Sequence, residues 1–68
     1  MFSYEKFEKL CEEKRITVRQ AAIQCGIATS TVSNWKLGRY EPKIDKILQI
    51  TSFFNVPLER LKDDERTD

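Results

Sequence analysis

The chain of 68 residues contains no histidine and only two cysteines, Cys11 and Cys25, which do not form a close ligand pair. Protein zinc sites need three or four such ligands, so the sequence predicts no metal site. The chain also lacks a pattern that pairs a nucleophile with a base, and a domain this small has little room for a substrate pocket. We therefore expect neither an enzyme nor a bound cofactor.

Long apolar runs are also missing, and the start MFSYEK is polar and acidic, unlike a signal peptide. These absences predict a soluble, cytoplasmic protein that does not bind a membrane. In a reducing compartment, two cysteines at apolar helix positions are expected to stay as buried free thiols. The length allows one domain with a small core.

The net charge is only +1, but the charges are unevenly distributed along the chain. Residues 1–13 carry two lysines and four glutamates, a net charge of −2, and residues 47–68 carry three cations and five acids, also −2. Residues 14–46 carry seven cations and two acids, a net charge of +5. A basic block between two acidic segments favours one surface that faces a polyanion.

Apolar residues recur at helical spacing, and no segment has the alternation of a strand. We expect an all-α fold of five short helices over residues 1–62, followed by an acidic, flexible tail over residues 63–68. The first four helices are expected at 4–14, from 17 to the glycine at 26, at 29–37, and from 43 or 44 to 54. The fifth is expected to follow Pro57.

Several residues mark where these helices start and stop. Ser3 is a good N-cap for the first helix, and Thr17 with Gln20 has the spacing of a capping box. Gly26 is suited to the left-handed conformation that ends a helix. The start of the third helix is ambiguous, because Ala28 is a poor N-cap and Thr29 or Ser30 is a better one.

The third helix has an unusual composition for a helix on a protein surface. Val32 and Trp35 are expected to face the core, which leaves threonines, serines, an asparagine and a lysine on the other side. These residues have low helix propensity, whereas a helix selected only for stability would carry Glu, Lys, Ala and Gln. Short polar side chains in this number favour close hydrogen bonding to a ligand over simple solvation.

The fourth helix is expected to be the central core helix. Its apolar residues follow the i, i+3, i+4, i+7 pattern. Two further apolar residues broaden this face, and one of them is expected to be partly exposed. The core set is Ile44, Ile47, Leu48, Thr51 and Phe54, and the additional residues are Ile50 and Phe53.

These motifs, taken in order, resemble the Cro/cI-type helix-turn-helix domain of phage repressors and related bacterial regulators. The matching elements are T-x-x-Q-x-A, Gly26, S-T-V-S-N-W, Gly38, Pro42, I-L-Q-I and V-P-L-E-R-L. The resemblance covers roughly residues 4–62 and implies a compact five-helix fold. It also implies that the second and third helices form a helix-turn-helix, with the third helix in the major groove of double-stranded DNA.

The resemblance assigns two sets of DNA-contacting residues. Residues near the start and middle of the third helix read base edges in the family, and here these are Thr29, Ser30, Ser33 and Asn34. The family holds phosphates with the start of the second helix and the loop after the third, and here the residues offered for this role are Arg19, Thr31, Lys36, Arg39, Tyr40 and Lys43. Asparagine can pair with adenine, and Thr or Ser with several base edges.

The chain departs from the family pattern at three places. Val18 stands where a glutamine often touches phosphate and supports base contacts. Lys36 and Cys11 stand where an acidic residue is sometimes paired with an arginine. Ala28 stands where a capping Ser or Thr is common.

The resemblance implies a sequence-specific transcriptional regulator, a phage or mobile-element repressor that binds a palindromic operator as a homodimer. The family's dimer surface would fall on Asn55, Pro57, Leu58, Arg60 and Leu61, although Leu58 and Leu61 could equally be core. A second interpretation stays open: an antitoxin, anti-repressor or modulator of the same fold that binds another regulatory protein. Loss of operator binding in Asn34→Ala with an intact partner complex would favour DNA reading.

Overall fold

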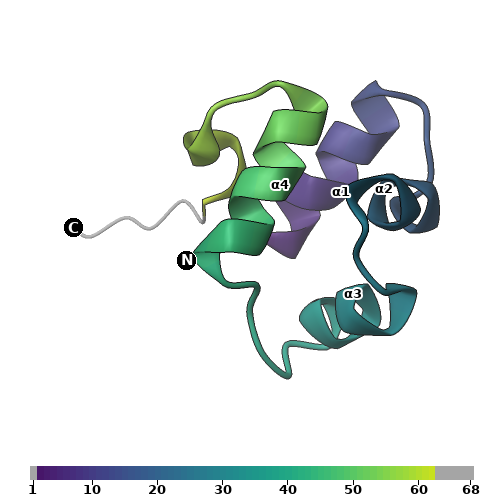
Figure 1. The fold of residues 1–68 in the computed structure, drawn as a ribbon, viewed down its shortest axis with the longest axis vertical. Coiled ribbons are helices and arrows are strands. Elements are labelled where there is room, and N and C mark those ends of the chain that lie inside the picture. Colours follow the sequence, from purple (N-terminus) through teal and green to yellow (C-terminus); the bar gives the residue numbers. More distant parts are fainter. Residues whose placement is uncertain (1, 63–68) are drawn as a thin grey trace.

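The computed structural model describes residues 2–62, and the predicted acidic tail at 63–68 lies outside them. The described chain forms four α-helices and one short 3-10 turn (Figure 1). These elements are α1 (Tyr4–Glu13), α2 (Val18–Cys25), α3 (Thr29–Lys36), α4 (Ile44–Phe54) and η1 (Leu58–Leu61). The all-α prediction is confirmed.

The predicted fifth helix is the one element that forms differently. Only four residues lie between Pro57 and Lys62, where Phe2 forms an antiparallel bridge to Lys62. Such a segment is too short for α-helical hydrogen bonding to continue, so it closes as a 3-10 turn. Residues 2–62 therefore form four helices and one 3-10 turn where five helices were expected.

Local hydrogen bonds explain where the helices begin and end. The Gln20 amide donates to Thr17 Oγ1 at 3.0 Å, and the Thr17 amide donates to Gln20 Oε1 at 2.9 Å, which confirms the capping box. Gly26 ends α2 with φ of +75°. The α3 helix begins at Thr29 after Ala28, which supplies no side-chain cap. The ambiguity at this start is thereby resolved, and α3 depends on packing for its stability.

An aromatic cluster forms the centre of the core and fixes α3 to the other helices. The Trp35 ring packs edge-on against Phe2 at a centroid distance of 5.6 Å and against Phe7 at 6.5 Å. Phe7 also packs against Phe54 of α4 at 6.2 Å. Because Phe7 lies on α1, one ring links α1, α3 and α4. The two alanines of α2 are fully buried, which lets that helix approach closely.

The expected core face of α4 is partly wrong. Ile44 and Leu48 are 57% and 52% exposed, whereas Ile50 is fully buried. The apolar residues of α4 cover a wider arc than its neighbours η1 and α2 can bury. The part of this arc that is buried includes Ile47, Ile50 and Phe54. Ile44 and Leu48 lie at the edge of this buried part and form an exposed apolar pair.

The two ends of the described chain are held together. The Ser3 amide donates to the Leu61 carbonyl at 2.7 Å, and Lys6 Nζ donates to the Lys62 carbonyl at 2.6 Å. Arg60 forms an ion pair with Glu13 at 3.1 Å, and both side chains are largely exposed. Such an exposed pair contributes at most about 1 kcal/mol, so the buried Leu61 side chain carries more of the attachment of η1.

Both cysteines are free thiols, as predicted. Cys11 is buried in the core, but Cys25 is only half-buried, so the prediction of two buried thiols holds for one of them. Burial raises the pKa of Cys11 to about 11, and the nearby Cys25, Glu8 and Glu12 add to the shift. Cys11 is therefore a protonated, unreactive thiol at neutral pH.

Removal of the Trp35 ring is expected to unfold much of the protein. Truncating a buried tryptophan to alanine costs about 3–5 kcal/mol, which is as much as a core of this size supplies. Trp35→Phe should cost less, because it keeps an aromatic ring and removes an indole N–H that has no hydrogen-bond partner within residues 2–62. Urea unfolding followed by circular dichroism measures both. Equal unfolding midpoints for the wild type and Trp35→Ala would contradict this role.

Candidate DNA-binding surface

The α3 helix is oriented by two buried side chains. Val32 and Trp35 are 4% and 5% exposed, as predicted, so the opposite side of the helix faces solvent. That side carries the four residues expected to read bases. Thr29, Ser30 and Ser33 are exposed and Asn34 is half-buried.

Figure 1 shows α3 at one edge of the molecule, where the loop of residues 37–43 leads from it to α4. Gly38 turns the chain out of the helix with φ of +74°, and Pro42 is buried. Leu37, at the C-cap of α3, is 65% exposed. It lies two helical turns after Ser30, so a large apolar side chain belongs to the outward face.

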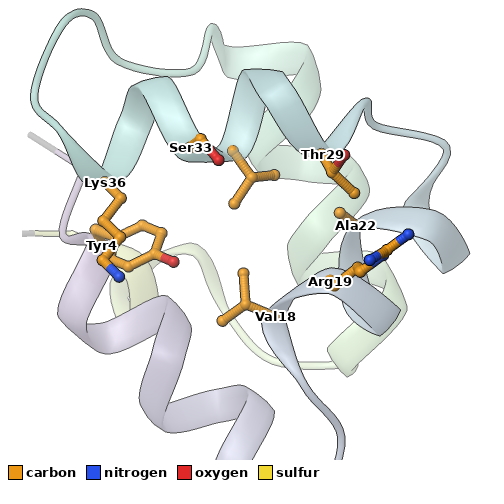
Figure 2. Close-up of a pocket in the computed structure, with 8 residues that line it drawn as sticks. Tyr4, Val18, Arg19, Ala22, Thr29, Ser33 and Lys36 are labelled. Carbon is orange, nitrogen blue, oxygen red and sulfur yellow. The ribbon is translucent and has the colours of Figure 1, made fainter.

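An open groove of about 270 Å³ separates one side of α3 from α1 and α2. Thr29, Ser33 and Lys36 line it from α3, at the i, i+4, i+7 spacing of one helix face. Val18, Arg19 and Ala22 line it from α2, and Tyr4 lines it from α1. In Figure 2 the Val18 side chain points into this space, with Lys36 and Tyr4 at one end and Arg19 at the other.

Asn34 is tied to the loop that follows α3. Its Nδ2 donates to Tyr40 Oη at 3.2 Å, and Arg39 Nη1 donates to Asn34 Oδ1 at 3.5 Å. The Arg39 amide also donates to the Asn34 carbonyl at 3.0 Å. The expected base reader and two expected phosphate contacts therefore form one polar cluster, which sequence reasoning did not anticipate.

The expected phosphate contacts fall into two groups in space. Arg19 and Lys36 line the groove, whereas Arg39, Tyr40 and Lys43 belong to the loop of residues 37–43. All five are exposed, and Thr31 on α3 is half-buried. Cations therefore lie in the groove on one side of α3 and in the loop that follows it, an arrangement that suits a polyanion.

Two of the places where the chain departs from the family pattern, Cys11 with Lys36 and Val18, can now be described in the structure. Cys11 lies in the core at 1% exposure, while Lys36 is exposed, so these positions hold no ion pair. Lys36 shares the groove with Tyr4 instead. Val18 is half-buried and gives the groove an apolar wall where a glutamine would give it a polar one.

Tyr4 is the groove residue that sequence reasoning missed. It lies on the same face of α1 as the buried residues Phe7 and Cys11, yet it is only half-buried. Its ring packs against Phe7 at 5.9 Å, while the residue also lines the groove. Tyrosine often buries its ring and leaves its hydroxyl available, which is the signal that could have identified it.

The residues expected at a dimer surface differ in exposure. Asn55, Pro57 and Arg60 are exposed and Leu58 is half-buried. Leu61 is 1% exposed and belongs to the core, because η1 docks through this side chain. The expectation that Leu61 lies on an interface is therefore corrected in favour of its alternative as core.

Two short helices meet at a left-handed glycine, and the second presents polar side chains between two groups of cations. This fold and surface define a helix-turn-helix DNA-binding domain. A comparison with family models supports the assignment: the model HTH_3, described as helix-turn-helix, matches residues 7–61. Since this is most of the chain, the protein belongs to the Cro/cI-type helix-turn-helix family.

The family assignment makes the chain a non-enzymatic, DNA-binding domain of the kind found in transcriptional regulators. No curated protein and no solved structure matches the chain significantly. Within residues 2–62, no helix is both long and apolar enough to cross a membrane.

A double-mutant cycle tests the bond between Asn34 and Tyr40. Asn34→Ala and Tyr40→Phe each remove one partner, so the double variant should lose less stability than the sum of the two single losses. The coupling should be about 0.5 kcal/mol, since the bond is exposed and neutral. Chemical unfolding of the four proteins gives this value. Strict additivity would mean that the two side chains do not interact in solution.

Proposed function

We propose that the protein is a sequence-specific, double-stranded DNA-binding transcriptional regulator, a phage or mobile-element repressor that binds a palindromic operator as a dimer. The exposed polar face of α3 is the observation that carries this proposal. Val32 and Trp35 are buried and therefore direct that face outward. The exposed residues have low helix propensity, so they do not stabilise the helix, and contact with a ligand explains their presence. An α-helix of this kind fits the major groove.

Base reading is assigned to Thr29, Ser30, Ser33 and Asn34. Ser30 lies opposite the buried side of α3, so it would penetrate deepest into the groove of the DNA. The hydroxyl side chains can donate to or accept from base edges, and the threonine methyl can contact a thymine methyl.

Asn34 has a double role in this proposal. A side-chain amide has two hydrogens and two acceptor lone pairs, and the bonds to Tyr40 and Arg39 use one of each. One hydrogen and one lone pair remain for the N6 and N7 positions of adenine. Asn34 would thus read a base while it holds two phosphate-binding side chains in place.

Phosphate binding is assigned to the cations and polar side chains on both sides of α3. Arg19 and Lys36 would hold one strand along the groove, and Arg39, Tyr40 and Lys43 would hold the other side from the loop. Thr31 would contribute a hydroxyl. Such contacts fix the register of the protein on DNA and provide salt-sensitive affinity without selecting a base.

A dimer would supply the affinity that one small domain lacks. Asn55, Pro57, Leu58 and Arg60 remain the proposed dimer surface, since they are at least partly accessible. The exposed pair Ile44 and Leu48 adds apolar area on α4 that a second copy can cover. A dimer with two-fold symmetry would place two α3 helices on half-sites about one helical turn apart.

The salt dependence of DNA binding tests the proposal. The logarithm of the association constant should fall linearly with the logarithm of salt concentration, with a slope of about −0.9 per neutralised phosphate. Arg39→Gln should make this slope less steep by about 0.9. Lys9→Gln on the exposed surface of α1 is the matched control and should leave it unchanged. Fluorescence anisotropy measures the series, and an affinity that is independent of salt would contradict DNA binding through these cations.

A further inference from the structure

The groove beside α3 has features that the assigned contacts do not explain. It brings Tyr4 of α1 next to Lys36 of α3, two residues far apart in the sequence. Figure 2 shows Tyr4 and Lys36 at the same end of the groove, with the tyrosine hydroxyl directed into it. The other lining residues include Val18 and Val32, which are apolar. One end of the groove therefore combines a cation, a hydroxyl donor and an apolar wall.

The position of Tyr4 is well defined by packing. Its ring lies edge-on to Phe7, with an interplanar angle of 70°, and Phe7 is a central core residue. Burial raises the pKa of Tyr4, and the nearby Glu8 and Cys11 add to the shift. The hydroxyl consequently keeps its proton at neutral pH and is available as a donor.

We propose that α1 takes part in DNA binding: Tyr4 and Lys36 hold one backbone phosphate, and the adjoining deoxyribose rests on the half-buried Val18 side chain. This inference depends on the proposed function, because the same groove continues onto the Thr29 and Ser33 hydroxyls of the reading face. Lys36 neutralises the phosphate and Tyr4 donates a hydrogen bond to it. The apolar Val18 side chain can then make van der Waals contact with the carbon atoms of the deoxyribose.

The acidic residues of α1 define the outer limit of this contact. Glu5 and Glu8 line a separate hollow that also includes Tyr4 and Lys36. A phosphate on that side would meet two carboxylates, whereas the groove side is lined by Arg19 and carries no acid. The charge pattern therefore directs the strand along the groove and away from the rest of α1.

A random-sequence duplex is a suitable probe, because backbone contacts do not depend on base sequence. Tyr4→Phe keeps the ring and its packing but removes the donor. We expect about tenfold weaker binding to this duplex with an unchanged salt slope, since no charge is lost. Lys36→Gln should weaken binding and also make the slope less steep by about 0.9. Lys9→Gln, on the far side of α1, is the control for charge removal.

The double variant Tyr4→Phe/Lys36→Gln shows whether the two residues share a phosphate. Its loss of affinity should be smaller than the product of the two single losses, and all variants should melt near the wild-type temperature. If the wild type binds the duplex and Tyr4→Phe binds it equally well, the role of α1 is wrong and the proposed function stands. If the wild type itself does not bind at low salt, the proposed function is wrong, and this inference is wrong with it.

Discussion

The packing of Trp35 between Phe2 and Phe7 attaches α3 to the rest of the domain. The α3 helix has no side-chain N-cap and a composition of poor helix formers, so its own sequence does not stabilise it. It exists as a helix because Val32 and Trp35 are inserted into the core. That insertion also fixes its rotation, so the stability of the domain and the presentation of the polar face have one cause.

The same constraint explains how residues from three parts of the chain form one surface. With the rotation of α3 set, Thr29, Ser33 and Lys36 face the groove shared with α1 and α2. Asn34 faces the other way, toward the loop with Tyr40. The surface proposed for DNA therefore has an ordered groove on one side of α3 and a hydrogen-bonded loop on the other. The residues proposed to read bases and to bind phosphates are thus held in relation to each other by the fold itself.

Local sequence signals predicted the helix-turn-helix well. The capping box at Thr17, the turn at Gly26 and the inward positions of Val32 and Trp35 depend on neighbours within a few residues, and each formed as expected. The exposure of Ile44 could not be predicted in this way. Periodicity shows that an arc of α4 is apolar, but which part is buried depends on where α2 and η1 pack against it.

Contacts between distant segments were the other part that the sequence could not reveal. The proximity of Tyr4 to Lys36 depends on the packing of α1 against the helix-turn-helix, and no spacing in the sequence encodes it. The bond from Asn34 to Tyr40 spans the turn at Gly38, whose conformation sets the path of the loop. The end of η1 at Leu61 likewise depends on a distant residue, because Phe2 pairs with the following Lys62 from the opposite end of the described chain.

Selection of bound sequences from a random duplex library tests whether the outward face of α3 reads DNA. We expect enrichment of a short motif that occurs twice, in inverted orientation, with centres about one helical turn apart. Repeating the selection with Ser30→Ala should relax the preference at specific base pairs and leave the spacing unchanged. The absence of any enriched motif would contradict base reading by α3. An enriched motif that stays the same in all three variants, Ser30→Ala, Thr29→Ala and Ser33→Ala, would contradict it as well.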